Sequence, residues 1–131
     1  MIKPKLLSNP WTYQGIPVEQ EHVKPFFGFV YIITDNETGN KYIGKKNFWV
    51  RKAVKGKTRK IKVPSDWMNY FSSHEWLKTE GKKTPERFKR EILHFCSTQG
   101  ETNWKEIEEQ VKRDVLYDDA YLNDNINREM V

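Results

Sequence analysis

Residues 27–44 read FGFVYIITDNETGNKYIG, and this stretch decides the fold of the chain. Its two apolar runs are rich in β-branched and aromatic residues, and the DNETGN segment between them supplies the Asp, Asn and Gly that a hairpin loop needs. The sequence therefore predicts a β-hairpin. Tyr31 and Tyr42 lie on separate runs, 11 positions apart, so strand pairing can bring both phenols onto one face if the register of the turn allows it.

A strongly basic segment follows the hairpin. Ten Lys or Arg residues and no acidic residue lie between Thr38 and Ser65. The formal net charge of +5 conceals this asymmetry, because the charge balance is +10 over residues 1–100 and −5 over residues 101–131. Phosphate contacts made by cations supply most of the non-specific affinity for nucleic acids. The charge pattern therefore favours nucleic acid as the partner.

Length and composition narrow the class of protein. A chain of 131 residues is long enough for one domain with its own core. No apolar run approaches the ~20 residues that span a bilayer, and the start, MIKPKLLSNP, lacks the apolar core of a signal peptide. The single cysteine, Cys96, excludes an intrachain disulfide and a multi-thiolate zinc site. We therefore expect a soluble protein of a reducing, cytoplasmic compartment without a membrane partner.

The segments around the hairpin predict a small α+β domain. Residues 1–26 lack periodicity and are expected to form an arm that packs through its aromatic residues, Trp11, Tyr13 and Phe26. Phe88–Cys96 favours a third strand, with a helix as the alternative. The expected fold is a small three-stranded antiparallel or mixed sheet flanked by helices, in a single domain of residues 1–131.

The clearest helix is predicted over residues 102–116, where Trp104, Ile107, Val111 and Val115 recur on one face that should meet the sheet. Capping residues predict shorter helices from Ser65 and from Ser73 to Gly81. A short helix is also expected over residues 45–54, and a final helical turn after Tyr117. Residues 55–62, KGKTRKIK, have no apolar face and are expected to form a mobile loop.

Several blocks of the sequence occur in the order of a known family. FVY at residues 29–31 followed by YIG at 42–44 resembles the paired signature of the GIY-YIG nucleases, with Phe29-Val30 in place of Gly-Ile. Together with YIGKKNFW, Ser-Asp-Trp and FKREIL, the pattern resembles the small phage-encoded, Seg-like endonucleases of that family. The resemblance implies the GIY-YIG fold and a metal-dependent endonuclease that hydrolyses DNA phosphodiester bonds.

The resemblance also implies a set of catalytic residues. Tyr31 and Tyr42 match the signature tyrosines, one of which is proposed in the family to help deprotonate the attacking water. A phenol with a pKa of ~10 is a poor base at neutral pH, so neighbouring cations are expected either to favour its phenolate or to let it share a proton with metal-bound water. The cation that holds the scissile phosphate is matched by Lys46 or Arg51. The late asparagine of the family is matched by Asn123, with Asn125 as the alternative.

The metal ligand implied by the resemblance is a glutamate of the long helix, which would bind Mg²⁺ or Mn²⁺ with water and phosphate oxygens. The candidates are Glu106, Glu108 and Glu109. The order of the blocks places Glu106 on the metal position, whereas periodicity puts Glu108 closer to the apolar face. The three histidines lack ligand spacing, so zinc is not expected; His74 is either a proton relay or an ordinary residue at a helix start.

DNA is the expected partner, and the chain is expected to act as a monomer or weak homodimer, in the host cytoplasm if it is phage-encoded. Two alternatives stay open: a non-catalytic nucleic-acid-binding protein of the same fold, and an interaction protein that uses its basic face. The cations expected to contact nucleic acid are Lys45, Lys52, Lys55, Lys57, Arg59, Lys60 and Lys62.

Overall fold

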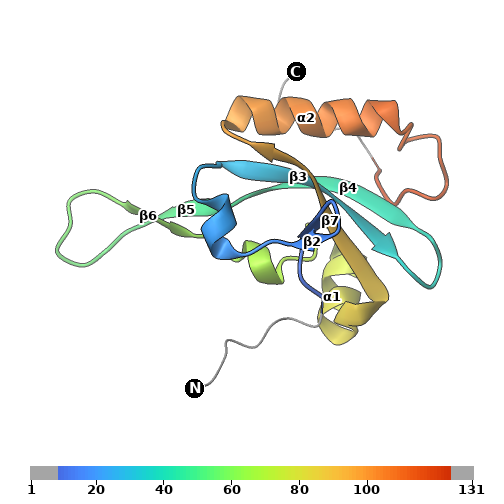
Figure 1. Cartoon of the computed structure of the whole chain (residues 1–131), viewed down its shortest axis with the longest axis horizontal. Coiled ribbons are helices and arrows are strands. Elements are labelled where there is room, and N and C mark those ends of the chain that lie inside the picture. The colour runs from blue at the N-terminus through green and yellow to red at the C-terminus, as the bar shows by residue number, and fades with distance from the viewer. Residues whose placement is uncertain (1–8, 125–131) are drawn as a thin grey trace.

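The computed structural model describes residues 9–124, and every structural statement below concerns these residues. A five-stranded mixed sheet forms its centre. Helix α2 (Gln99–Lys112) covers one face of the sheet, and helix α1 (Glu75–Lys83) lies on the other side (Figure 1). The predicted α+β class is confirmed. Neither helix has the length or apolarity that crossing a bilayer requires.

The three predicted strands form the middle of the sheet. β3 (Gly28–Asp35) and β4 (Lys41–Asn47) make the predicted hairpin, and β7 (Phe88–Cys96) pairs antiparallel with the other side of β3. The register pairs Ile33 with Tyr42, so Tyr42 shares one face of the sheet with Tyr31. Beyond β7 lie two short strands, β1 (Thr12–Tyr13), which runs parallel to it, and β2 (Ile16–Pro17).

The core lies on both faces of β3, because alternate residues of a strand point to opposite sides. On the α1 side, Phe29 and Tyr31 pack with aromatic residues that include Trp11 and Trp67. The indole N–H of Trp11 donates to the carbonyl of Trp67 at 2.7 Å, which ties the N-terminal arm to the body. A smaller cluster under α2 contains Val30, Ile32, Ile43, Cys96 and Val115.

The helix predicted over residues 45–54 is wrong. β4 continues to Asn47, and β5 (Trp49–Lys52) follows and pairs antiparallel with β6 (Ile61–Pro64). Apolar cross-strand pairs such as Val50 with Val63 favour this extended pairing. The two strands project from the body as an arm (Figure 1). We call residues 49–64 the ribbon; the predicted loop is reduced to residues 53–60, between its strands.

The predicted short helices differ in extent from the observed ones. The segment after Ser65 forms only the 3-10 turn η2 (Trp67–Asn69), and α1 runs through Gly81 instead of ending there. A Cβ on Gly81 would lie 2.3 Å from the ring of Phe71, so glycine permits close packing here. Two further 3-10 turns are η1 (Gln20–Val23) and η3 (Pro85–Arg87).

The predicted buried face of the long helix is wrong for Trp104 and Val111, whereas Val115, just beyond the end of α2, is buried as predicted. Trp104 and Val111 of α2 are 56% and 55% exposed. Polar groups of β4 and β7 lie beneath α2, and the helix supplies their partners: Asn103 accepts from Lys45, and Glu109 contacts His94 at 3.1 Å. Hydrogen bonding therefore decides which face is buried. The residues buried on this face are Thr102, Asn103, Glu106, Glu109 and Gln110.

An extended segment replaces the helical turn predicted after Tyr117. The N–H of Lys41 donates to the carbonyl of Ala120, and the N–H of Leu122 donates to the carbonyl of Lys41, both at 2.7 Å. This pairing beside β4 brings residues 123 and 124 to the edge of the sheet. The alternative residue Asn125 lies outside the described range.

Candidate active site

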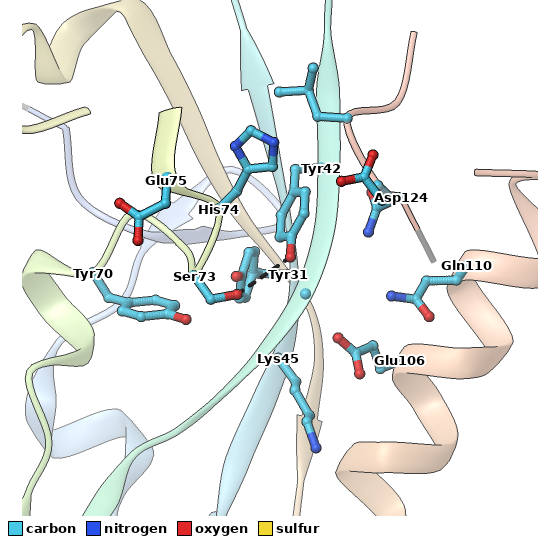
Figure 2. Close-up of a pocket in the computed structure, with 13 residues that line it drawn as sticks. Tyr31, Tyr42, Lys45, Tyr70, Ser73, His74, Glu75, Glu106, Gln110 and Asp124 are labelled. Atoms are coloured by element: carbon cyan, nitrogen blue, oxygen red, sulfur yellow. Dashed lines mark hydrogen bonds between the residues drawn. The ribbon is translucent and has the colours of Figure 1, made fainter. Parts of the chain in front are cut away.

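A cavity of about 1090 Å³ opens along the outer edge of β4, between α2 and the loop that precedes α1 (Figure 2). Its walls come from segments far apart in the sequence. The lining residues are Tyr31, Tyr42, Gly44, Lys45, Tyr70, Ser73, His74, Glu75, Glu106, Gln110, Leu122, Asn123 and Asp124.

Three tyrosines meet in this cavity. The ring centroids of Tyr31 and Tyr42 lie 6.4 Å apart, and Tyr70, from the loop after η2, lies 6.0 Å from Tyr31. A Cβ on Gly44 would lie 2.3 Å from the hydroxyl oxygen of Tyr31, so the glycine leaves the space that this hydroxyl occupies. No local sequence pattern connects Tyr70 to the hairpin, so its place in the cavity is not predictable from the sequence alone.

The surroundings of the phenols favour their protonated form. Burial raises the pKa of Tyr31 well above 10, and the nearby phenols of Tyr70 and Tyr42 raise it further. Burial also raises the pKa of Tyr42, partly offset by a hydrogen bond with Ser73 at 3.5 Å. The protein groups around these tyrosines therefore do not favour a phenolate, and the expected alternative, a proton shared with metal-bound water, stays a prediction.

The wall opposite the tyrosines is formed by α2. Glu106 and Gln110, one helical turn apart, point into the cavity (Figure 2). The charge of Glu106 contributes to the raised pKa of both Tyr31 and Tyr42. Of Glu106, Glu108 and Glu109, only Glu106 is among the described residues that line the cavity.

The other two glutamates are engaged elsewhere on α2. Glu109 contacts His94 at 3.1 Å and accepts from Arg113 at 3.0 Å. Glu108 lies 3.4 Å from Lys105, and its side chain is 42% exposed. Although ligand atoms of His94, Glu108 and Glu109 lie within 4.8 Å of one another, these pairings already occupy both carboxylates.

The cations predicted to bind phosphate do not lie together, because successive residues of a strand point to opposite faces of the sheet. Lys45 lines the cavity and donates to the side chain of Asn103 on α2. Lys46 points the other way, pairs with Asp66 at 2.7 Å and lies 4.3 Å above the ring of Tyr70. Arg51 is exposed on β5, outside the cavity.

Asn123 completes the edge of the sheet. Its side-chain oxygen accepts from the N–H of Ile43 at 3.0 Å, and its side-chain nitrogen donates to the carbonyl of Ile43 at 2.8 Å. Both polar groups thus bond the β4 backbone, which docks the C-terminal segment. The neighbouring Asp124 is exposed and lines the cavity.

The loop before α1 holds His74 beside the tyrosines. Its ring centroid lies 5.6 Å from that of Tyr42, and its Nδ1 faces the N–H of Leu77 at 3.5 Å, at the start of α1. Ser72 has a φ of 83°, an unfavourable value for a residue with a side chain, and its hydroxyl accepts from the N–H of His74 at 3.0 Å. His74 is thus both a residue at a helix start and part of the cavity wall.

The polar atoms on the α2 side of the cavity suit a hard divalent cation. The carboxylates of Glu106 and Asp124 and the amide of Gln110 all line it. Mg²⁺ and Mn²⁺ prefer such oxygen ligands and commonly use one or two carboxylates, with water and phosphate completing the coordination shell. The donor set therefore fits the expected metal.

The cations predicted to contact nucleic acid lie mostly on the ribbon. Lys45 belongs to the cavity, whereas the other six are exposed on β5, β6 or the loop between them. Lys62 lies 4.6 Å above the ring of Trp49. The six are Lys52, Lys55, Lys57, Arg59, Lys60 and Lys62.

Comparison with protein families gives a match, over residues 11–126, to a family described as "Putative endonuclease segE, GIY-YIG domain". Searches of curated proteins and of solved structures found no match. The matched range includes the β3–β4 hairpin, both signature segments and every residue that lines the cavity. The chain therefore belongs to the GIY-YIG endonuclease family, in its segE group.

Proposed function

We propose that the chain is a divalent-metal-dependent endonuclease that hydrolyses DNA phosphodiester bonds in the cavity at the β4 edge. The observation that carries this proposal is the position of Tyr31 and Tyr42 opposite the Glu106 carboxylate (Figure 2). Hydrolysis requires an activated water, neutralisation of charge on the phosphate and protonation of the leaving oxygen. The cavity offers groups suited to each task.

Glu106 would hold the metal ion, with Asp124 and Gln110 as further oxygen donors. When bound, the ion supplies positive charge at the phosphate and makes water a stronger acid. Glu106 suits this role because it is 7% exposed and projects from a regular helix, which fixes its position. Its burial strengthens the attraction to a cation.

The tyrosines would act as protonated phenols. Their raised pKa values favour hydrogen-bond donation to phosphate oxygens over action as free phenolate bases. A proton from the attacking water can pass to the oxygen of Tyr42 as the proton of that hydroxyl moves to Ser73, 3.5 Å away, and on to solvent. Tyr42 then serves as a relay and remains neutral overall.

Lys45 is the cation that we assign to the scissile phosphate, because it lines the cavity. Lys46 acts through its contact with Tyr70, and Arg51 belongs with the ribbon. Asn123 is a positioning residue, since both of its polar groups hold the backbone of Ile43. Of the predicted catalytic residues, Tyr31 and Tyr42 are thus assigned to the reaction itself, whereas Lys46 and Asn123 hold neighbouring groups in position.

Phe29-Val30, which differ from the family signature, lie in the core and not in the cavity. Both are fully buried, and the ring of Phe29 stacks on Phe48 with centroids 4.7 Å apart. Phe-Val in place of the Gly-Ile of the signature therefore adds side chains to the core and leaves the cavity residues in place. It gives no support to the non-catalytic alternative.

Incubation of supercoiled plasmid with the protein tests the proposal. We expect cleavage with Mg²⁺ and none with a chelator. Glu106→Gln should abolish cleavage and leave DNA affinity nearly unchanged, because it removes a metal ligand and little phosphate-contacting surface. Glu108→Gln is the matched control on the same helix, outside the cavity, and should stay active.

The opposite pattern, with Glu106→Gln active and Glu108→Gln or Glu109→Gln inactive, would show that the metal ligand is Glu108 or Glu109. Full activity in all three variants would refute a metal site on the helix. Cleavage that persists in excess chelator would refute metal dependence.

A further inference from the structure

The ribbon carries apolar side chains that the core does not use. Val50 is 45% exposed and Ile61 is 40% exposed, and neither belongs to the two core clusters of the described residues. The register pairs Val50 with Val63 and Lys52 with Ile61, so these four residues share one face of the ribbon. We call this the apolar face of the ribbon.

The opposite face anchors the ribbon to the body. Trp49 donates its indole N–H to the carbonyl of Phe26 at 2.8 Å, and Lys62 lies over its ring. The hydroxyl of Ser65 donates to the carbonyl of Asn47 at 2.7 Å at the base of the ribbon. The base is thus fixed, and the apolar face and the loop of residues 53–60 are free to meet a partner.

The ribbon is a direct continuation of the strand that borders the cavity. Lys52 lies eight residues after Gly44, which at about 3.4 Å per residue is at most about 27 Å of chain. That length corresponds to about eight base pairs of duplex DNA. A duplex with one phosphate in the cavity can therefore reach the ribbon within about one helical turn.

We propose that the ribbon enters the major groove of the bound duplex, where Val50 and Ile61 contact the methyl groups of thymine and the ribbon cations contact the flanking phosphates. This inference rests on the proposed function in that the same duplex occupies the cavity. A two-stranded β-ribbon fits the major groove, which is about 12 Å wide, and not the minor groove of about 6 Å. Surface cations alone would explain phosphate binding, but not an exposed aliphatic face between them.

The test compares affinity for two 30-bp duplexes of alternating sequence, one with thymine and one with uracil in its place. Uracil lacks only the methyl group. The full-length protein should bind the uracil duplex at least about fourfold more weakly, which corresponds to the burial of one methyl group. Val50→Ser combined with Ile61→Ser should bind both duplexes equally.

Ile16→Ser is the matched control, because Ile16 is an aliphatic residue of the body that is 67% exposed. It should keep the thymine preference. A second variant replaces residues 53–60 by Asn-Gly, a two-residue turn that joins the paired residues Lys52 and Ile61. It removes the loop cations but keeps the apolar face, so the dependence of affinity on salt should become flatter while the preference for thymine stays.

Equal binding of the two duplexes by the full-length protein would overturn the inference, as would a thymine preference that survives the double serine substitution. Because these are binding measurements, they are independent of cleavage. A thymine preference in a protein that never cuts plasmid would support the groove contact and refute the proposed catalysis. Plasmid cleavage without a thymine preference would support the proposed catalysis and overturn the groove contact.

Discussion

At the scale of single residues, the cavity depends on Gly44 and Tyr31, which pair directly across β4 and β3. The hydroxyl of Tyr31 occupies the space that a Cβ on residue 44 would need, since the two positions would lie only 2.3 Å apart. The glycine is required for this close approach, and its backbone conformation is ordinary. Gly44 therefore determines the position of the Tyr31 hydroxyl in the cavity.

Gly44→Ala should shift the Tyr31 ring and lower the cleavage rate by about a hundredfold, the effect of a misplacement of about 1 Å. The free energy of unfolding should fall by about 1–3 kcal/mol, as for other overpacked cores. Plasmid cleavage and urea unfolding measure the two effects. Gly100→Ala, where a Cβ meets open space, is the control and should leave the rate unchanged. A fully active Gly44→Ala protein would show that the Tyr31 hydroxyl need not be in this position.

Tyr31→Phe and Tyr42→Phe should each fold normally and lower the cleavage rate by more than about tenfold, the low end of what a proton-transfer group contributes. Each substitution keeps the ring and removes only the hydroxyl. Tyr117→Phe is the control, because Tyr117 is 88% exposed and lies outside the cavity. Unchanged rates at saturating Mg²⁺ would reduce both tyrosines to packing residues.

At the scale of elements, a buried arginine of β7 positions the loop that carries Tyr70. Arg90 donates to the carbonyls of Met68 at 3.0 Å and Tyr70 at 2.8 Å. Its guanidinium lies 4.3 Å above the ring of Phe71, and burial lowers its pKa to about 10. The loop that forms one cavity wall is thus fixed to the central sheet by hydrogen bonds to its backbone.

The loop of residues 53–60 supplies another prediction at this scale. Removing one cation that binds a phosphate should flatten the slope of log affinity against log salt by about 0.9 for duplex DNA. Neutralising Lys57, Arg59 and Lys60 together should therefore lower the slope by up to about 3, while cleavage at saturating protein survives. Titration of duplex DNA at several salt concentrations measures it.

The charge-matched control neutralises three exposed cations outside the ribbon, Lys78, Lys83 and Lys89, and should keep the wild-type slope. A wild-type slope in the ribbon variant would exclude phosphate contacts by this loop and favour an acidic protein partner. Normal binding without cleavage would instead place a catalytic cation on the ribbon.

At the scale of the whole molecule, the buried Asp35 joins the hairpin turn to the segment that leads into β7. Arg87 donates to it through Nε at 2.9 Å and through Nη2 at 2.8 Å. These hydrogen bonds outweigh the effect of burial and lower the pKa of Asp35 to about 2. Asp35 ends β3 and Arg87 directly precedes β7, so the pair links two segments that are distant in sequence and adjacent in space.

Because the folded pKa of Asp35 lies below its unfolded value near 3.8, the pair stabilises the fold above about pH 4, and this contribution disappears as the pH falls toward 2. We expect a loss of about 1 kcal/mol, since solvent at the partly exposed Arg87 screens the pair. Asp35→Asn should lack this pH-dependent loss in urea unfolding at pH 5 and pH 2.5, whereas the exposed control Asp119→Asn should retain it. Equal pH dependence in Asp35→Asn and the wild type would contradict the assignment.

The sequence by itself determined the features that depend on neighbouring residues. The hairpin and the third strand follow from the two-residue period of a strand and a short turn, whereas the register that puts Tyr31 and Tyr42 on one face comes from the structure. The order of the blocks also pointed to Glu106, which lies in the cavity. These features need no knowledge of distant contacts.

Only the tertiary structure decided which face of α2 is buried, which lysine lines the cavity and that Tyr70 belongs to it. Apolar periodicity assigned Trp104 and Val111 to the core, but α2 packs through polar residues because polar groups of β4 and β7 lie beneath it. Lys45 and Lys46 are adjacent residues of the same type, and they differ only in the side of β4 to which each points. Arg90, twenty residues away in sequence, donates to the carbonyl of Tyr70 and so holds this residue at the cavity. The basic segment forms a ribbon because Val63 is the cross-strand partner of Val50.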